Sequence, residues 1–382
     1  MKTNFYGFAF LILLTMKACQ STDPASLPNR PAVFGSSSSS VYSSVTSQNI
    51  PSNNPNTSNT SNTSSISPLY SFGTSLQLVS PSGLSTNSHP LQIDAKRSRD
   101  YPGSDITIEA TLDPGSNYSR YYVSYLSDGL KIYGMMTVPN GPKPPTGWPV
   151  VIFNHGYIPP NIYRTTERYV RYLDEIASHG YIVFKSDYRG HDRSEGTPGG
   201  AYTQDNYTTD VLNAVASVKH YPDADPNRIG MWGHSMGGYI TLRSMVITKD
   251  IKAGVIWGGV VAPYPDLYTR WNPAARETAQ GPGSWVYSME QSFGTPQSNP
   301  RFWQSISANS YLKDLNGPIQ IHTGLADEEV PWQFSQMLYD EMLAAHQTAE
   351  LYTYEGDNHN ISNNFGLAMQ RTVEFFDRYL KN

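Results

Sequence analysis

Gly233, Ser235 and Gly237 form a G-x-S-x-G pattern, which can hold a serine on a sharp turn between a strand and a helix. A strand is expected before it, at Ile229–Trp232, and a helix from Gly237 onward. Small residues are needed beside the serine because larger side chains would collide within so tight a turn. The pattern therefore predicts that Ser235 is a nucleophile.

A serine hydroxyl needs a general base to take its proton, and the base needs a carboxylate to fix its tautomer. Among the nine histidines, His359 lies on a loop between an expected strand and an expected helix near the C-terminus. Asp327 lies just beyond the end of the strand expected at 318–323, and it precedes the histidine in the required order. Three other carboxylates of these loops remain alternatives: Glu328, Glu329 and Asp357. We therefore predict a catalytic triad of Ser235, Asp327 and His359.

The negative oxygen that forms during acyl transfer needs two hydrogen-bond donors. We expect one to be the backbone amide of Met236, at the start of the helix that follows the nucleophile. The second usually comes from the loop after an earlier strand, which makes the Tyr157 amide the candidate. The phenol of Tyr157 is equally suited to assist the anion or to form a wall of the pocket. His234, beside the nucleophile, is expected to pack or to form hydrogen bonds.

These groups need strands that end at one edge of a sheet, and the apolar pattern predicts such a sheet. Alternating runs at 121–126 and 131–138 flank Asp128-Gly129, which is typical of an antiparallel hairpin. Further strands are expected at 150–153, 181–185, 229–232, 253–257, 318–323 and 350–354. Helices are expected between them at 167–178, 205–220, from 237, at 332–345 and at 367–380. The alternation predicts an α/β fold with a mainly parallel sheet covered by helices on both faces.

Residues 260–310 interrupt this alternation and contain eight aromatic residues, which predicts a cap insertion. Three tryptophans in or beside it are candidates for the substrate pocket: Trp257, Trp271 and Trp285. The alternative is that they belong to the core, where clustered aromatic side chains are more common.

Residues 1–19 begin with Met1-Lys2 and continue with an apolar run and a small-residue end, as a signal peptide does. About 12 apolar residues would extend only roughly 18 Å as a helix, short of a bilayer core of about 30 Å. Met16-Lys17-Ala18-Cys19 resembles a bacterial lipobox, with Lys17 in place of the usual small residue. We therefore expect lipidation of Cys19 and an exported lipoprotein on the outer side of a bacterial membrane. A cleaved secretory protein and an uncleaved anchor are the alternatives.

Two further parts follow the signal. From Pro31 to Ile93 the chain has no Asp, Glu, Lys or Arg, and it includes a Ser, Thr, Asn and Pro-rich repeat. Such a composition cannot offset the entropy of ordering, so residues 20–94 are predicted to be a disordered tether. Residues 95–382 are then the catalytic domain.

Composition excludes several classes of protein. With 27 Lys and Arg against 32 Asp and Glu, the chain has no basic field for nucleic acid. One cysteine excludes an intrachain disulfide framework and a cysteine-based zinc site. The H-E-x-x-H, P-loop and dinucleotide patterns are absent, so neither a metal nor a cofactor is expected. The sequence makes no prediction of the oligomeric state.

With these residues placed, the chain from about Tyr121 to Asn382 resembles an α/β-hydrolase, and most closely the catalytic domain of the prolyl oligopeptidase family. The matching segments are Val123–Pro139, Asn154–Gly156, Asp187–Gly190, Asp225–Gly230, Gly233–Tyr239, Gly324–Pro331 and Asp357–His359. The resemblance implies the same triad, in a family where peptidases and carboxylesterases share one domain. Family peptidases commonly carry a large N-terminal β-propeller, and selection of substrates by a propeller is not expected here.

The resulting hypothesis is an exported serine hydrolase that cleaves peptide bonds through an acyl-enzyme. A carboxylesterase acting on small acyl esters is the alternative. A binding protein on an inactive hydrolase fold is a more remote one, because all three triad members are present. A haloperoxidase or lyase would need the same serine turn.

Overall fold

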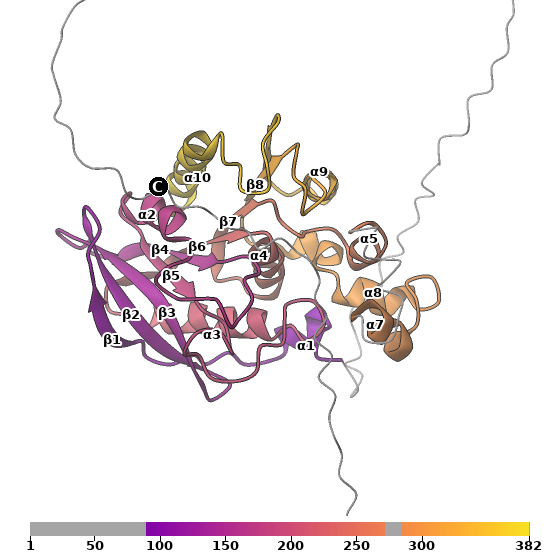
Figure 1. Cartoon of the computed structure of the whole chain (residues 1–382), viewed down its shortest axis with the longest axis horizontal. Coiled ribbons are helices and arrows are strands. Elements are labelled where there is room, and N and C mark those ends of the chain that lie inside the picture. Colours follow the sequence, from indigo (N-terminus) through magenta and orange to yellow (C-terminus); the bar gives the residue numbers. More distant parts are fainter. Residues whose placement is uncertain (1–88, 272–284, 382) are drawn as a thin grey trace, which may run out of the picture. The chain divides into compact units, whose positions relative to one another are not determined.

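The computed structural model describes residues 89–271 and 285–381, and its elements are labelled in Figure 1. The strands are β1 (Thr107–Leu112), β2 (Tyr118–Ser127), β3 (Leu130–Pro139), β4 (Trp148–Asn154), β5 (Ile182–Ser186), β6 (Ala224–His234), β7 (Ile251–Trp257), β8 (Ile319–Gly324) and β9 (Ala349–Tyr354). The helices are α1 (Ile93–Arg97), α2 (Val170–Ala177), α3 (Asn206–Lys219), α4 (Met236–Ile247), α5 (Tyr264–Arg270), α7 (Trp285–Phe293), α8 (Pro300–Ile306), the 3₁₀ helix η1 (Ala308–Asp314), α9 (Gln333–Ala344) and α10 (Phe365–Leu380).

The described strands form one sheet in the order β1-β2-β3-β5-β4-β6-β7-β8-β9. The first four pair antiparallel, and the six from β5 to β9 pair parallel. The predicted hairpin is β2 and β3, turned by Asp128 and Gly129, both with positive φ. The parallel half places the C-terminal ends of β4, β6, β8 and β9 at one edge. This is the α/β-hydrolase fold that the sequence predicted.

Helices cover both faces of the sheet. Side chains of α2 and α10 pack with one face of the strands, whereas α3, α4 and α9 contribute to the core on the other face. Figure 1 shows α2 and α10 on one side of the strands and α3 on the opposite side. The central strands are buried on both faces, which explains their nearly continuous apolar sequence.

Several boundaries differ from the sequence prediction. Strand β1 and helix α1 were not predicted, and β6 begins at Ala224 rather than Ile229. Helix α2 begins at Val170 rather than Glu167, because Tyr169 has a φ of 61° and cannot continue a right-handed helix. In the described part of the chain, no helix is long and apolar enough to cross a membrane.

Helix α1 joins the folded region before residue 95, its predicted start. Leu91 and Ile93 are buried, and the backbone carbonyl of Leu91 accepts a hydrogen bond from Arg243 of α4. Lys96 is buried as well, with Nζ 2.9 Å from Thr209 Oγ1 and 3.4 Å from Asp205 Oδ2. The folded region therefore includes residues that the sequence assigned to the tether.

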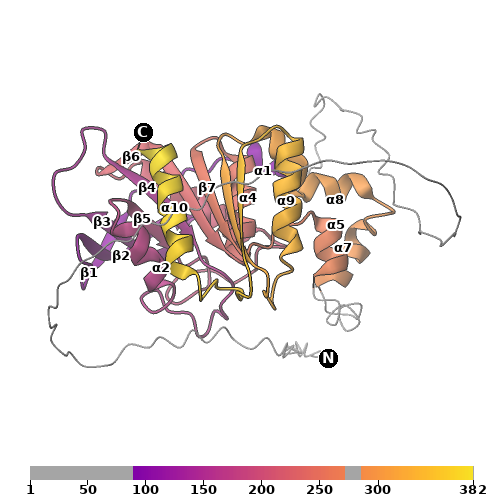
Figure 2. The same ribbon diagram turned by 90° about the horizontal axis from the view of Figure 1, so that it is seen from above.

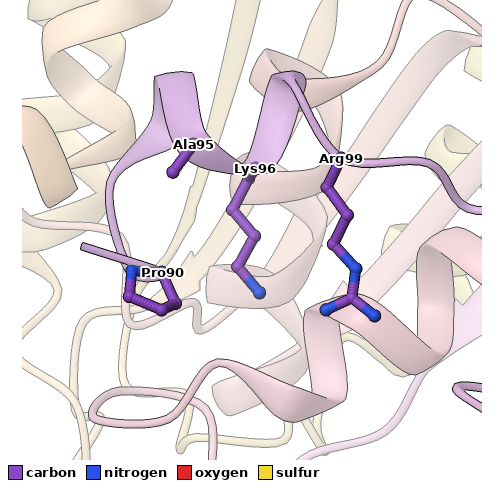
Figure 3. A pocket seen from close by; sticks show the side chains of 4 residues that line it. All are labelled: Pro90, Ala95, Lys96 and Arg99. Atoms are coloured by element: carbon purple, nitrogen blue, oxygen red, sulfur yellow. The ribbon is translucent and has the colours of Figure 1, made fainter. Parts of the chain in front are cut away.

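A small pocket of about 290 Å³ lies beside α1, lined by Pro90, Ala95, Lys96 and Arg99. Figure 3 shows the Lys96 and Arg99 side chains projecting in the same direction. Each is paired with a carboxylate, Lys96 with Asp205 and Arg99 with Asp128. Lys96 therefore braces α1 against α3, and Arg99 holds the segment after α1 to the turn between β2 and β3.

The segment predicted as a cap lies between β7 and β8 and contains α5, α7, α8 and the start of η1. Figures 1 and 2 both show α5, α7 and α8 grouped at the side of the fold away from β1, β2 and β3. Tyr264 and Trp303 are fully buried within the segment. Its aromatic residues therefore serve in part as core.

Candidate active site

Ser235 stands on the turn between β6 and α4 with φ 55° and ψ −120°, a conformation that is strained for a residue with a side chain. A Cβ on Gly233 would come within 2.2 Å of the Gly237 carbonyl oxygen, and a Cβ on Gly237 within 2.0 Å of the Asn154 carbonyl oxygen. Both positions therefore require glycine. The backbone amide of Ser235 donates to the Trp257 carbonyl oxygen at 2.9 Å, which fixes the turn against the end of β7.

Met236 is the first residue of α4, and its side chain is buried. The first amides of a helix have no acceptor within the helix, and they carry the positive end of its dipole. The Met236 amide therefore remains the predicted donor to a negative oxygen formed at Ser235.

His359 and Asp327 form a close pair, with Nδ1 2.7 Å from Oδ2. The other carboxylate oxygen of Asp327 accepts the backbone amides of Glu329 and Val330, both at 2.9 Å. The His359 side chain is 6% exposed, and the Asp327 side chain is 0% exposed. Since a carboxylate can only accept, His359 donates from Nδ1 and keeps its Nε2 lone pair for a proton.

The structure distinguishes Asp327 from the alternative carboxylates. Glu328 and Glu329 are exposed. Asp357 is buried, but its two oxygens accept the backbone amides of Asn363 and Asn364 before α10. Asp357 therefore stabilises the loop that carries the histidine.

The imidazole of His359 lies close to the serine turn. An ideal Cβ built on Gly258 would be 3.1 Å from His359 Nδ1, and Gly258 directly follows the Trp257 carbonyl that binds the serine amide. The rings of His234 and His359 have centroids 4.5 Å apart. The loops after β6, β8 and β9 thus bring Ser235, Asp327 and His359 to the same edge of the sheet.

The loop after β4 also reaches this edge. An ideal Cβ on Gly156 would lie 3.2 Å from Ser235 Cβ. The Gly156 carbonyl oxygen lies 2.7 Å from His155 Nδ1, and this carbonyl shares its peptide plane with the Tyr157 amide. The Tyr157 ring is 55% exposed, so the backbone amide remains the better candidate for an oxyanion donor.

The three tryptophans proposed for the pocket differ in position. Trp257 does not line a pocket: it is fully buried, packs between sheet and α10, and donates from Nε1 to Thr372 Oγ1 at 3.2 Å. Trp271 is partly exposed and donates from Nε1 to the Glu329 carbonyl oxygen at 3.0 Å. Trp285 begins α7, but its side chain lies outside the described residues, as does Cys19.

Tyr169 is a residue near the site that the sequence did not indicate. Its hydroxyl lies 3.0 Å from the Gly156 amide and 2.7 Å from His234 Nδ1. No local motif marks this tyrosine, because its position depends on a backbone conformation at the start of α2. The structure also confirms that His234 forms hydrogen bonds.

Burial shifts the pKa values of two ionisable side chains, Lys185 in β5 and Asp187 directly after β5. Desolvation lowers the pKa of Lys185 to about 8 and raises the pKa of Asp187 to about 6. Lys185 Nζ donates to the carbonyl oxygens of Thr165 and Arg168 at 2.7 and 2.6 Å. Lys185 therefore holds the segment that leads to Tyr169.

In the described part of the chain, no cluster of three or more His, Cys, Asp or Glu side chains could hold a metal ion.

Comparison with known proteins places this geometry in a family. The model of the prolyl oligopeptidase family matches residues 170–382. The uncharacterized peptidase YtmA of Bacillus subtilis is 24% identical over 250 residues, which cover 64% of this chain and 88% of YtmA.

Solved structures share the fold at low identity. A puromycin-hydrolyzing peptidase of Mycobacterium tuberculosis superposes with a TM-score of 0.57 at 18% identity, over 70% of this chain and 40% of that chain. An acetyl xylan esterase from Paenibacillus sp. R4 superposes with a TM-score of 0.56 at 19% identity, over 77% of this chain and 96% of that chain. The chain thus spans less than half of the peptidase and nearly all of the esterase. The protein belongs to the prolyl oligopeptidase family and is a serine hydrolase.

Proposed function

We propose that the protein is a serine peptidase that cleaves peptide bonds with Ser235, Asp327 and His359 as its catalytic triad. The observation that carries this proposal is the buried His359–Asp327 pair beside a serine on a strained, glycine-flanked turn. The family match and the similarity to a relative named as a peptidase support the choice of substrate bond.

In the proposed mechanism, Ser235 Oγ attacks the carbonyl carbon while its proton passes to His359 Nε2. Asp327 keeps Nδ1 protonated and stabilises the imidazolium that forms. The amides of Met236 and Tyr157 bind the negative oxygen. Collapse of this intermediate breaks the bond to the leaving group, which takes the proton from Nε2 and leaves an acyl-enzyme. A water molecule then attacks the acyl-enzyme while its proton passes to His359 Nε2. The bond to Ser235 Oγ breaks, the proton returns to this oxygen, and the acid is released.

A carboxylesterase is the second candidate. The acetyl xylan esterase is covered almost completely by this chain, whereas the puromycin-hydrolyzing peptidase is covered to 40%. Esters need less protonation of the leaving group than amides, so the same triad suits both reactions. An inactive binding protein is disfavoured because the acid and base are paired in the geometry that catalysis needs.

We further propose that the protein is exported and anchored through a lipid on Cys19. The charge, apolar run and small-residue end of residues 1–19 support this proposal. Replacement Cys19→Ser should move the protein from the membrane fraction to the soluble exported fraction, or leave it unprocessed. Membrane retention of a processed Cys19→Ser chain would contradict lipidation.

The activity is tested with two substrates that share one acyl group, a nitrophenyl ester and a peptidyl nitroanilide. Ser235→Ala serves as the blank, and its kcat should be lower by roughly 10⁴ to 10⁶-fold while the fold is retained. Turnover of the anilide at a rate comparable to that of the ester supports the peptidase. Turnover of the ester alone supports the carboxylesterase. Undiminished hydrolysis by Ser235→Ala would refute the mechanism for both.

A further inference from the structure

Four groups form a continuous hydrogen-bonded chain across the back of the candidate active site. The Gly156 amide lies 3.0 Å from Tyr169 Oη, and this oxygen lies 2.7 Å from His234 Nδ1. The other nitrogen of the ring, His234 Nε2, lies 3.1 Å from the His359 carbonyl oxygen. The chain therefore links the loop after β4 to the loop after β9 through the residue that precedes Ser235.

The direction of each hydrogen bond follows from its two ends. A backbone amide can only donate and a carbonyl oxygen can only accept. His234 must therefore donate from Nε2, accept at Nδ1 from the Tyr169 hydroxyl, and leave that hydroxyl to accept from Gly156. This requires a neutral imidazole, in agreement with burial, which lowers the pKa of His234 to about 3. The donor and the acceptor of each of these three hydrogen bonds are thereby defined.

Both ends of this hydrogen-bonded chain belong to loops that supply groups for catalysis. Gly156 precedes Tyr157, the candidate oxyanion donor, and a Cβ built on Gly156 would lie 3.2 Å from Ser235 Cβ. His359 is the candidate base, and its backbone carbonyl is the final acceptor. The two loops follow separate strands, β4 and β9. The chain joins them across the serine turn.

The backbone at Tyr169 shows that the surrounding structure imposes this position. Tyr169 has a φ of 61°, a conformation that residues with side chains rarely adopt. Lys185, buried below it, binds the carbonyl oxygen of the preceding residue, Arg168, at 2.6 Å. Such a backbone conformation persists only where the surrounding structure determines it.

We propose that Tyr169 and His234 are positioning residues for acyl transfer, which hold the oxyanion donor and the general base in register with the nucleophile. The proposal rests on the function proposed for Ser235 and His359, but not on the choice between peptide and ester. Loss of the phenol would free the Gly156 amide and leave His234 Nδ1 without its donor. Small displacements of catalytic groups lower the rate far more than they alter binding.

The rate of Ser235 labelling by a fluorophosphonate measures this effect without a known substrate. The reagent replaces fluoride by Ser235 Oγ at phosphorus, and the proton of the hydroxyl passes to the general base. Tyr169→Phe retains a ring to pack against Phe153 and Trp232 but removes the hydroxyl. We expect its second-order labelling rate to fall by about 10 to 100-fold. With a substrate, kcat should fall by a similar factor, and KM should change by less than about 3-fold.

Variants of the histidine add a rescue test. His234→Gln keeps one acceptor and one donor, so it should label faster than His234→Ala. Because the two residues act as a unit, the double variant Tyr169→Phe/His234→Ala should be no slower than the slower single variant, within about 3-fold. If the fold-loss in labelling rate of the double variant equals the product of the two single losses, the shared role is contradicted.

Tyr181→Phe is the matched control. Tyr181 is a buried tyrosine of the same core cluster, and its hydroxyl donates to Asp377 at 2.6 Å, away from the site. We expect Tyr181→Phe to lower the melting temperature but to leave the labelling rate unchanged. Equal losses in Tyr181→Phe and Tyr169→Phe would overturn the proposal, because destabilisation would then explain both.

The remaining outcomes separate this inference from the proposed function. If folded Tyr169→Phe labels within about 3-fold of wild type, the positioning role is wrong while the triad stands. If Tyr169→Phe does not fold, the comparison of His234→Gln with His234→Ala decides in the same way. If the wild type is not labelled, or Ser235→Ala is labelled equally, the proposed function fails and this inference fails with it.

Discussion

Because the fold holds His322 in its neutral form, the protein should be measurably less stable in mild acid than at neutral pH. His322 is fully buried in β8, with Nδ1 2.8 Å from Tyr354 Oη and Nε2 2.7 Å from Gln320 Oε1. Burial, with a smaller contribution from Arg371, lowers the pKa of His322 to about 3. The folded protein therefore keeps this imidazole neutral at pH values where the unfolded chain protonates it.

The sign and size of the effect follow from proton linkage. Below the unfolded pKa of about 6.5 the unfolded state binds one proton more than the folded state, so stability falls as the pH falls. Each pH unit costs about 1.4 kcal/mol until the pH reaches the folded pKa of about 3. Between about pH 7 and about pH 5, His322 alone should lower the free energy of unfolding by about 2 kcal/mol.

Urea unfolding of wild type and His322→Gln at both pH values tests this number. Glutamine has no charge at either pH, so the variant should lose about 2 kcal/mol less stability than wild type on acidification. Taking the difference between the two proteins cancels the other titrating groups. His220→Gln, which replaces an exposed histidine, should behave as wild type. Equal acid losses in wild type and His322→Gln, within about 0.5 kcal/mol, would refute the assignment of a neutral buried His322.

Three further predictions concern the site and the start of the fold. Asp327→Asn should lower kcat by about 10⁴-fold in the nitrophenyl ester assay, because it removes the carboxylate that fixes the base; a loss below about 10-fold would contradict this role. Gly237→Ala should prevent normal folding, since the new Cβ would lie 2.0 Å from the Asn154 carbonyl oxygen; thermal unfolding like that of wild type would refute the clash. Deletion of residues 1–88 should retain cooperative unfolding by circular dichroism, whereas deletion of residues 1–97 should abolish it by removing the buried Leu91 and Ile93; equal stability of the two would contradict the packing of α1.

Much of the fold could be predicted because its signals are local. The central strands are short apolar runs between turn residues, and burial on both faces makes such runs recognisable. The G-x-S-x-G pattern around Ser235 is visible without the structure, and the need for glycine at Gly233 follows from the carbonyl of Gly237, four residues away. The need for glycine at Gly237 is set by the distant Asn154 carbonyl, which only the structure shows. Asp327 could be chosen because it lies at a strand end.

Other features depend on contacts between distant residues. Helix α1 has only five residues, and its position is set by partners such as Arg243, about 150 residues away. Trp257 was wrongly placed in the pocket, because a strand buried on both faces does not reveal which face each side chain occupies. Tyr169 was missed because its left-handed backbone conformation is imposed by the surrounding tertiary structure.

The helices between β7 and β8 occupy one uninterrupted stretch of chain, which has consequences for how such an enzyme can diversify. The stretch begins after the carbonyl that holds the serine turn and ends before the strand that leads to Asp327. Insertions, deletions or a recombined segment there leave the order and register of the parallel strands unchanged. Evolution or protein engineering can therefore replace this segment as a module while Ser235, Asp327 and His359 keep their positions. Such a graft would need to keep a partner for the Glu329 carbonyl, which Trp271 now supplies.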